Sequence, residues 1–410
     1  MATDIIIIGA GIMGLSTAWQ IARRSTLNIA VLEKASSLGE GSTGASSAIC
    51  RHRYSRDEMI ELARDGIAAY RNWSAFTGLT GPEAGYHNDG VLWVNANGGS
   101  WAEKERDRLQ RHDIGAEVIS HVDIRQRFPD LSACITPPDL ETGEPHECEH
   151  SGQFLFETDG GYFEPVDALN DLARAAGRAG VDIQLQTPVS SLVITGGRTR
   201  GVKLEDGRVI DAPVVINTSG PWCNDILTTV GLADRWPLKA TRIQVMHINR
   251  PTTLTGKIPV CCDQVGGVYF REQNRGQQIV VGSAREEDER EVVDPSDYND
   301  WIDDDFKASR LHALQHRIPA LTESIRVMGY TGLYTVNQRD VHPVVGESGI
   351  DGFHVANGFS GHGFKIAPAV GSLLAQQITG NSVDFDTGID PGFLAFDREP
   401  IQVDAKNVLA

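Results

Sequence analysis

The sequence predicts an α/β fold in which a parallel βαβ unit comes first and a strand-rich second domain is interleaved with it. Residues 4–8 form a short apolar run, and a glycine-rich turn, a helical pattern over 12–23 and a second apolar run over 28–32 follow. This is the order of a buried βαβ unit. Residues 238–283 are rich in strand patterns, which indicates a second sheet. No repeat or Gly/Ser linker divides the 410 residues, so we expect segments of the two domains to alternate along the chain.

Helical patterns define further layers of the fold. Residues 56–80 carry apolar residues at helical spacing with charges on one face. The helix predicted over 165–179 has a proline in its first turn and ends before a glycine, and the helix over 304–317 ends before a proline. A last helix is expected over 367–378, directly after a glycine-rich turn. The acidic stretch 286–305 is expected to be an exposed loop that leads into a helix.

Short apolar or alternating runs predict the other strands. They lie at residues 90–94, 153–158, 181–185, 189–194, 200–204, 214–217, 241–248, 279–283, 330–335 and 353–356. Two of them flank Gly196 and Gly197, which predicts an antiparallel meander at that point.

The charge of the chain excludes some classes of partner. Its 37 basic and 55 acidic residues give a net charge of −18, whereas proteins that bind nucleic acid or anionic membranes need basic surfaces. No apolar run reaches the roughly 18–20 residues of a membrane-spanning helix. The apolar start of the chain lacks the basic region of a signal peptide, so we expect a cytoplasmic protein. The six cysteines form no C-x-x-C pair, which favours free thiols.

The first turn carries a dinucleotide-binding fingerprint. Residues 9–14 read G-A-G-I-M-G and lie between a predicted strand and a predicted helix. The first glycine allows a tight turn, the second allows a pyrophosphate to approach the backbone, and the third lets helix and strand pack closely. The next strand ends at Glu33, 19 residues after Gly14. A carboxylate there is placed to bind ribose hydroxyls and disfavours the 2′-phosphate of NADP.

Two more glycine-rich turns point to a larger ligand than the fingerprint alone requires. Residues 39–47 are rich in glycine and serine, and residues 358–365 read G-F-S-G-H-G-F-K near the end of the chain. The turn 217–222 ends a third predicted strand. Backbone N–H groups in such turns suit an extended cofactor that crosses the sheet. FAD therefore fits better than NAD, because an NAD site leaves the turn at 358–365 unexplained.

At these landmarks the sequence resembles the FAD-dependent family of D-amino acid oxidase, glycine oxidase and monomeric sarcosine oxidase. The resemblance also includes residues 41–51, 160–165, 332–334 and 342–346. It implies a glutathione-reductase-like FAD-binding Rossmann domain and a substrate domain built on a mixed or antiparallel sheet. We assign the first domain to residues 1–85, 160–222 and 323–385, the substrate domain to 86–159 and 223–322, and a C-terminal tail to 386–410.

The motifs and the resemblance together nominate residues that bind FAD. They are Gly9, Gly11, Ile12, Met13, Gly14, Glu33, Lys34, Gly41, Ser42, Thr43, Ser46, Val189, Ser219, Gly220, Trp222, Gly332, Gly361, His362, Gly363, Phe364 and Lys365. Members with covalent flavin carry a cysteine two residues before a pocket tyrosine. This chain has Gly332 at that position, so we expect non-covalent FAD.

The sarcosine-oxidase-like branch also implies the residues that meet the substrate. It holds a substrate carboxylate between an arginine and a lysine, which match Arg51 and Lys365. A guanidinium and a second cation suit a carboxylate physically. Tyr334 matches a tyrosine that lines the substrate pocket, and His52 is either a proton relay or a residue at a helix start. His362 is expected at the flavin edge.

The resemblance implies oxidation of a secondary or N-substituted amino acid such as sarcosine, dimethylglycine, glycine or an iminodiacetate-like compound. Hydride passes from the carbon next to nitrogen to flavin N5, and the imine is then hydrolysed. Oxidases of this branch use a second lysine to activate O2, and the matching strand, 278–282, has valine there. O2 is the expected electron acceptor, and a different electron acceptor is left open. Assembly into a homo-oligomer is also left open. The alternatives are a D-amino acid or 2-hydroxyacid dehydrogenase and a non-redox FAD protein.

One further motif needs weighing. Residues 146–150 read H-E-C-E-H, which matches the H-E-x-x-H zinc protease pattern. That pattern binds zinc only on a helix, where both histidines share one face. Prolines and glycines surround it here, so we expect an exposed loop and no catalytic metal. Residues 135–152 look like an insertion relative to simpler family members.

Overall fold

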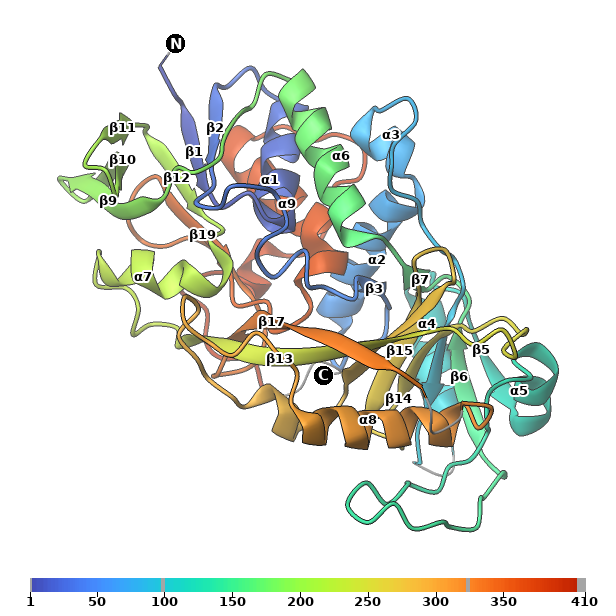
Figure 1. The fold of residues 1–410 in the computed structure, drawn as a ribbon. Coiled ribbons are helices and arrows are strands. Elements are labelled where there is room, and N and C mark those ends of the chain that lie inside the picture. Colours follow the sequence, from blue (N-terminus) through green and yellow to red (C-terminus); the bar gives the residue numbers. More distant parts are fainter. Residues whose placement is uncertain (1, 97–99, 322–324, 404–410) are drawn as a thin grey trace.

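The computed structural model describes residues 2–96, 100–321 and 325–403 and builds them around two large sheets (Figure 1). One sheet has six strands in the order β18-β19-β12-β1-β2-β8, and the other has eight in the order β17-β13-β16-β15-β14-β4-β6-β5. Helices cover the six-stranded sheet, while helix α8, Asp304–Arg317, lies along the eight-stranded one (Figure 1). The predicted α/β fold, with a Rossmann domain beside a mixed sheet, is confirmed.

The six-stranded sheet begins with the predicted βαβ unit. Strand β1 pairs in parallel with β2 and with β12, and β2 pairs in parallel with β8. All four residues of β1 and of β2 are buried, as expected for parallel strands with covered faces. The strands of this sheet are β1 Ile5–Ile8, β2 Ile29–Leu32, β8 Asp182–Gln184, β12 Val214–Asn217, β18 Val344–Glu347 and β19 Phe353–Asn357.

The eight-stranded sheet is antiparallel except for one parallel pair, β14 with β4. Its longest pairing joins β13 and β17 from Leu238 opposite Asn337 to Ile248 opposite Val327. The strands are β4 Val91–Val94, β5 Ala116–Ser120, β6 Gln153–Glu157, β13 Leu238–Asn249, β14 Val260–Asp263, β15 Val268–Gln273, β16 Gln278–Ser283 and β17 Val327–Asn337.

Two smaller sheets contain the other strands of the described chain. The predicted meander is present as β9 Val189–Thr195, β10 Arg198–Leu204 and β11 Val209–Asp211. Gly196 and Gly197 form its first turn with φ of +62° and +75°, the left-handed conformation that a tight hairpin requires. A second small sheet joins β3, Ile49–Cys50, to β7, Gly161–Tyr162, and so links two distant parts of the chain.

The helices include several that the sequence patterns did not predict, namely α4, α5 and α7. The α-helices are α1 Ile12–Ala22, α2 Asp57–Arg71, α3 Trp73–Thr77, α4 Trp101–Arg111, α5 His121–Arg127, α6 Pro165–Arg178, α7 Cys223–Thr228, α8 Asp304–Arg317 and α9 Gly363–Thr379. Short 3-10 turns lie at Gly220–Trp222, Glu286–Glu289 and Pro391–Phe393.

Helix α9 begins four residues before the predicted start at 367, so residues 363–365 belong to its first turn rather than to a preceding loop. Proline inside a helix cannot donate the helical hydrogen bond. In the structure Pro368 lies inside the helix, and the hydroxyl of Tyr70 on α2 donates to the carbonyl of Phe364 at 2.8 Å. That carbonyl is the one the missing N–H would have satisfied. Gly66 lets α2 approach closely, because a Cβ there would lie 2.2 Å from the carbonyl oxygen of Lys365.

The division into domains stays a prediction, although one strand bears on it. The range 323–385 was assigned to the FAD-binding domain, but β17 within it is paired along its length with β13 of the eight-stranded sheet. The two predicted domains therefore share this segment.

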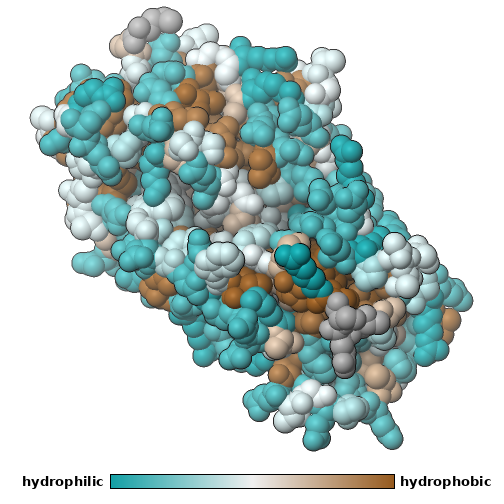
Figure 2. All heavy atoms as spheres, in the orientation of Figure 1, coloured by the Kyte–Doolittle hydropathy of each residue, from teal (hydrophilic) through white to brown (hydrophobic). Residues whose placement is uncertain are grey.

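The surface is mostly hydrophilic on the face that Figure 2 shows. Hydrophobic residues appear there in separate patches. Among the described helices, none is both long enough and apolar enough to cross a bilayer.

Candidate active site

A cavity of about 950 Å³ lies where the two large sheets meet. The ends of β1 and β2 contribute Ile8 and Leu32, and β13 and β17 contribute Ile243 and Leu333 from the other sheet. All three predicted glycine-rich turns also reach this cavity, and most residues of 39–47, 218–222 and 358–365 contribute to its wall. Segments far apart in the sequence therefore form one extended site.

Most of the residues predicted to bind FAD line this cavity. They are Gly9, Gly11, Ile12, Met13, Glu33, Lys34, Gly41, Ser42, Thr43, Ser46, Val189, Ser219, Gly220, Trp222, Gly332, Gly361, Gly363, Phe364 and Lys365. Gly14 and His362 are outside the lining as the structure describes it.

The fingerprint glycines are required by close contacts. Gly9 has a φ of +99°, and a Cβ there would lie 2.8 Å from the carbonyl oxygen of Thr218. A Cβ on Gly14 would lie 2.0 Å from the carbonyl oxygen of Gly9, so Gly14 packs the helix against the turn. The first turn of α1 contains no acidic residue, which leaves its positive end suited to an anion such as a pyrophosphate.

The carboxylate of Glu33 is held beside this turn. Its Oε2 accepts from the amide of Ala10 at 2.8 Å, and its Oε1 accepts from the amide of Ala35 at 2.9 Å. The ammonium of Lys34 lies 3.2 Å from the centre of the Trp222 ring. Both features place fixed polar groups at the end of the cavity expected to take the ribose.

The Gly/Ser turn adds a second test of the fit to FAD. The hydroxyl of Thr43 accepts from the amide of Ile12 at 3.0 Å, which ties this turn to the fingerprint. Ser42 lines the cavity with a buried hydroxyl that has no hydrogen-bond partner among the described residues. A cofactor with phosphate and hydroxyl groups would supply such a partner, so the residues present fit FAD.

Arg51 and Lys365 meet at one wall of the cavity. The guanidinium carbon of Arg51 lies 4.2 Å from the centre of the Tyr54 ring, and the ammonium of Lys365 lies 5.8 Å from the same centre. Burial, followed by the charge of Arg51, lowers the pKa of Lys365 to about 7. The two cations are thus close enough to repel each other, and an anion placed between them would relieve that repulsion.

Tyr334 lies on β17 in the same cavity. Tyr269 of β15 lines the same cavity, and burial raises the pKa of both Tyr334 and Tyr269 above the usual value. Both phenols therefore stay neutral and can donate hydrogen bonds. Tyr54 and Tyr269 were not among the predicted site residues.

The two histidines predicted for the site, His52 and His362, lie outside the described cavity lining. His52 is 3% exposed, and its Nδ1 is 3.0 Å from Oε2 of Glu157 on β6, outside the described cavity lining. The same carboxylate accepts from the indole of Trp93 at 2.8 Å, so His52 belongs to a buried polar network. The ring of His362 packs edge-on against Tyr54, with 5.1 Å between ring centres.

The strand matched to the oxygen-activating lysine is β16. Its Val280 and Val281 are fully buried. Among the described residues that line the cavity, the lysines are Lys34 and Lys365.

Comparison with known proteins agrees with this geometry. The chain is 24% identical to the FAD-dependent oxidoreductase domain-containing protein 1 of Xenopus laevis over 92% of this chain and 79% of that protein. It is 23% identical to the human peroxisomal sarcosine oxidase over 91% of each chain. The solved structure of L-proline dehydrogenase from P. horikoshii superposes with a TM-score of 0.81 at 20% identity, covering 96% of this chain and 97% of that one, which shows a shared fold.

The family profile described as "DAO: FAD dependent oxidoreductase" matches residues 4–377. This match spans both sheets and all three glycine-rich turns of the cavity. The resemblance found in the sequence is thereby confirmed, and the chain belongs to the DAO family of FAD-dependent oxidoreductases.

Proposed function

We propose that this protein oxidises a secondary or N-substituted amino acid, and that Arg51 and Lys365 bind its carboxylate. One observation carries the proposal: two buried cations from distant segments line the cavity together with Tyr334, and both lie close to the ring of Tyr54. A guanidinium offers two parallel donors to a carboxylate, and an ammonium adds charge without competing for that geometry. Within the described chain, no carboxylate forms an ion pair with Lys365, which leaves this ammonium available to a substrate.

The protein residues then have separate tasks. Arg51 and Lys365 orient the substrate, while Tyr334 and Tyr269 close the wall and exclude water. FAD, when bound, supplies the hydride acceptor. No protein base is required when the substrate binds as the neutral amine, which is consistent with the position of His52 outside the cavity lining. Water hydrolyses the imine product.

The names of two similar proteins support a secondary amine as the substrate. Sarcosine and L-proline both carry a secondary amine next to the carbon that is oxidised. A D-amino acid or a 2-hydroxyacid is the alternative substrate class, and a non-redox role of FAD is the alternative function.

We propose O2 as the electron acceptor. A dehydrogenase is the second candidate, because buried valines occupy the strand where related oxidases have a lysine. Turnover in air with release of H2O2 supports the oxidase. Turnover that requires an added dye in place of O2 supports the dehydrogenase.

We also propose that FAD is bound without a covalent bond. Gly332 offers no sulfur, and a Cβ at this position would lie 2.7 Å from Cβ of Ala45. Acid precipitation of the purified protein should leave a yellow supernatant. Flavin that stays in the pellet would show attachment elsewhere.

The experiment that tests the function is anaerobic titration of the yellow protein. Sarcosine, L-proline, iminodiacetate and D-alanine are added separately, and the flavin absorbance is recorded. Bleaching by a secondary amine and not by D-alanine is the expected result. Bleaching by D-alanine alone would favour the D-amino acid alternative, and no bleaching by any amine would favour a non-redox role.

A further inference from the structure

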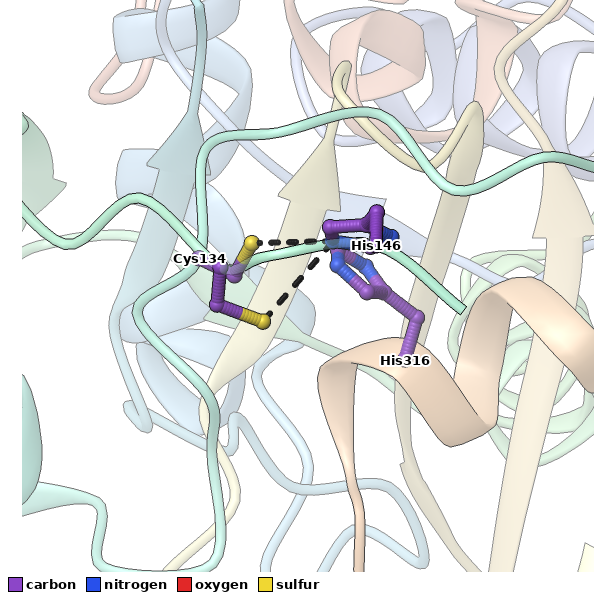
Figure 3. Close-up of side chains that lie close together, drawn as sticks. Cys134, His146 and His316 are labelled. Carbon is purple, nitrogen blue, oxygen red and sulfur yellow. Dashed lines mark hydrogen bonds between the residues drawn. The ribbon is translucent and has the colours of Figure 1, made fainter. Parts of the chain in front are cut away.

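A group of cysteine and histidine side chains lies outside the cavity. Cys134, His146 and Cys148 come from the segment 128–152 between α5 and β6, and His316 comes from the last turn of α8. Figure 3 shows Cys134 and His146 facing His316 across the space between the loop and the helix. None of the four is among the described residues that line the cavity. We call these four residues the Cys/His cluster.

The distances in the Cys/His cluster match those of a tetrahedral metal site. One ligand atom from each residue lies within 4.8 Å of all the others. Sγ of Cys134 is 3.4 Å from Nε2 of His146, and Sγ of Cys148 is 3.7 Å from the same nitrogen. With Zn–S of about 2.3 Å and Zn–N of about 2.0–2.1 Å, a tetrahedral zinc ion separates its sulfur and nitrogen ligands by about 3.5 Å.

His316 provides an independent indication of a ligand. Both of its ring nitrogens are buried, and neither has a hydrogen-bond partner in the part of the chain that the structure describes. A buried polar atom without a partner is unfavourable, and a metal ion would satisfy one of the two nitrogens. The ring lies 5.0 Å from that of His146, centre to centre.

The protein holds the two sides of the Cys/His cluster together by other contacts. Next to His316, the guanidinium of Arg317 donates to Asp263 at 2.8 Å, and the backbone carbonyl of Arg317 accepts from the amide of Ser132 at 2.8 Å. The amide of Ile135 donates to the carbonyl of Glu149 at 3.0 Å and closes the loop. The ligands are therefore positioned by the fold, as a preformed site requires.

We propose that the Cys/His cluster is a structural zinc site that fastens the loop 128–152 to helix α8. Two thiolates and two neutral imidazoles in tetrahedral arrangement are a donor set typical of Zn²⁺. All four positions are filled by protein, which is the pattern of a structural rather than a catalytic site. Of the H-E-x-x-H sequence, His146 takes part and His150 does not. A loop this long without helix or strand gains order from such a crosslink.

The first test is the zinc content of the purified holoenzyme, measured by mass spectrometry of the metal after desalting. The chain offers a matched control, because His150 lies next to the site in sequence but outside it. We expect about one zinc per chain in the natural protein and in His150→Gln, and less than about a tenth of that in His146→Gln, Cys148→Ser and His316→Gln. Equal flavin content shows that each variant is folded.

The second test follows the loop itself by proteolysis with the glutamate-specific enzyme Glu-C. Its possible cleavage sites in the loop are Glu141, Glu147 and Glu149. Because a bound ion lowers the population of the open loop, free Zn²⁺ at 100 times its Kd should slow cleavage about 100-fold. A chelator should remove this protection from the natural protein and change nothing in His316→Gln.

Three results would overturn the proposal. The first is a natural protein that holds less than about a tenth of a zinc ion per chain when purified with zinc. The second is equal zinc in all variants, which would place the ion elsewhere. The third is a disulfide between Cys134 and Cys148 in protein prepared with zinc, since its sulfurs could not serve as thiolate ligands.

Discussion

Replacing Lys365 by methionine tests the carboxylate site most directly. The change keeps the length of the side chain but removes its charge. A charge-assisted hydrogen bond contributes roughly 1.5–3 kcal/mol, so kcat/KM for a carboxylate-bearing amine should fall about 10- to 150-fold where Lys365 is protonated. Rates are compared per bound flavin, because Lys365 is also among the residues expected to bind FAD.

The size of this effect should depend on pH. Burial and the charge of Arg51 lower the pKa of Lys365 to about 7, so the substrate-free enzyme carries this charge below pH 7 and loses it above. The profile of kcat/KM reports groups of the free enzyme. The ratio of kcat/KM between the natural enzyme and the variant should therefore be largest near pH 6 and come within a few-fold of one near pH 9.

The ratio is the informative quantity, because ionisation of the substrate amine affects both enzymes equally and cancels. Initial rates at several pH values with sarcosine or another amine identified by flavin bleaching provide it. A large ratio that stays constant from pH 6 to pH 9 would show that Lys365 keeps its charge over this range and would refute the lowered pKa. A ratio near one at every pH would remove Lys365 from substrate binding altogether.

Three further substitutions test other parts of the site and the fold. Glu33→Ala should weaken FAD binding about 10- to 150-fold in a flavin fluorescence titration, because it removes a charged acceptor of roughly 1.5–3 kcal/mol; unchanged affinity would mean the ribose contact is misassigned. Tyr334→Phe should lower kcat/KM about 2- to 10-fold with FAD retained, the effect of one neutral hydrogen bond of roughly 0.5–1.5 kcal/mol. Tyr70→Phe should lower the free energy of unfolding in urea by about 1–3 kcal/mol, because the carbonyl of Phe364 loses its donor; an unchanged midpoint would show that this carbonyl finds another partner.

The parts of the site that are local in sequence could be predicted from it. The turn 9–14 and Glu33 form one βαβ unit, so their spacing alone fixes how they meet. Arg51, Lys365 and Tyr334 were identified by resemblance, and the structure brings them into one cavity, although their roles stay predictions. Tyr269 could not be predicted, because its place at the cavity depends on packing between distant strands. The contact of His52 with Glu157 could not be predicted either, since Glu157 lies on the distant strand β6, and the role of His52 stays a prediction.

Errors in the fold have equally physical causes. The start of α9 was predicted too late because residues 358–365 were interpreted as one glycine-rich turn. Pro368 lies inside the helix, and the hydroxyl of Tyr70 donates to the carbonyl that lacks the proline's N–H. The Cys/His cluster was missed because the sequence search followed the spacing of His146 and His150. Its fourth member, His316, is supplied by a helix far along the chain.

The close contact of α2 with α9 has a consequence for how this enzyme could diversify. Gly66 touches the backbone of Lys365, and Tyr70 holds the carbonyl of the residue before it. Neither is among the described cavity-lining residues. Substitutions at these two positions would move the ammonium of Lys365 and leave every lining side chain unchanged. In a directed-evolution experiment, α2 is therefore a place where altered substrate preference and compensating second-site mutations should accumulate together.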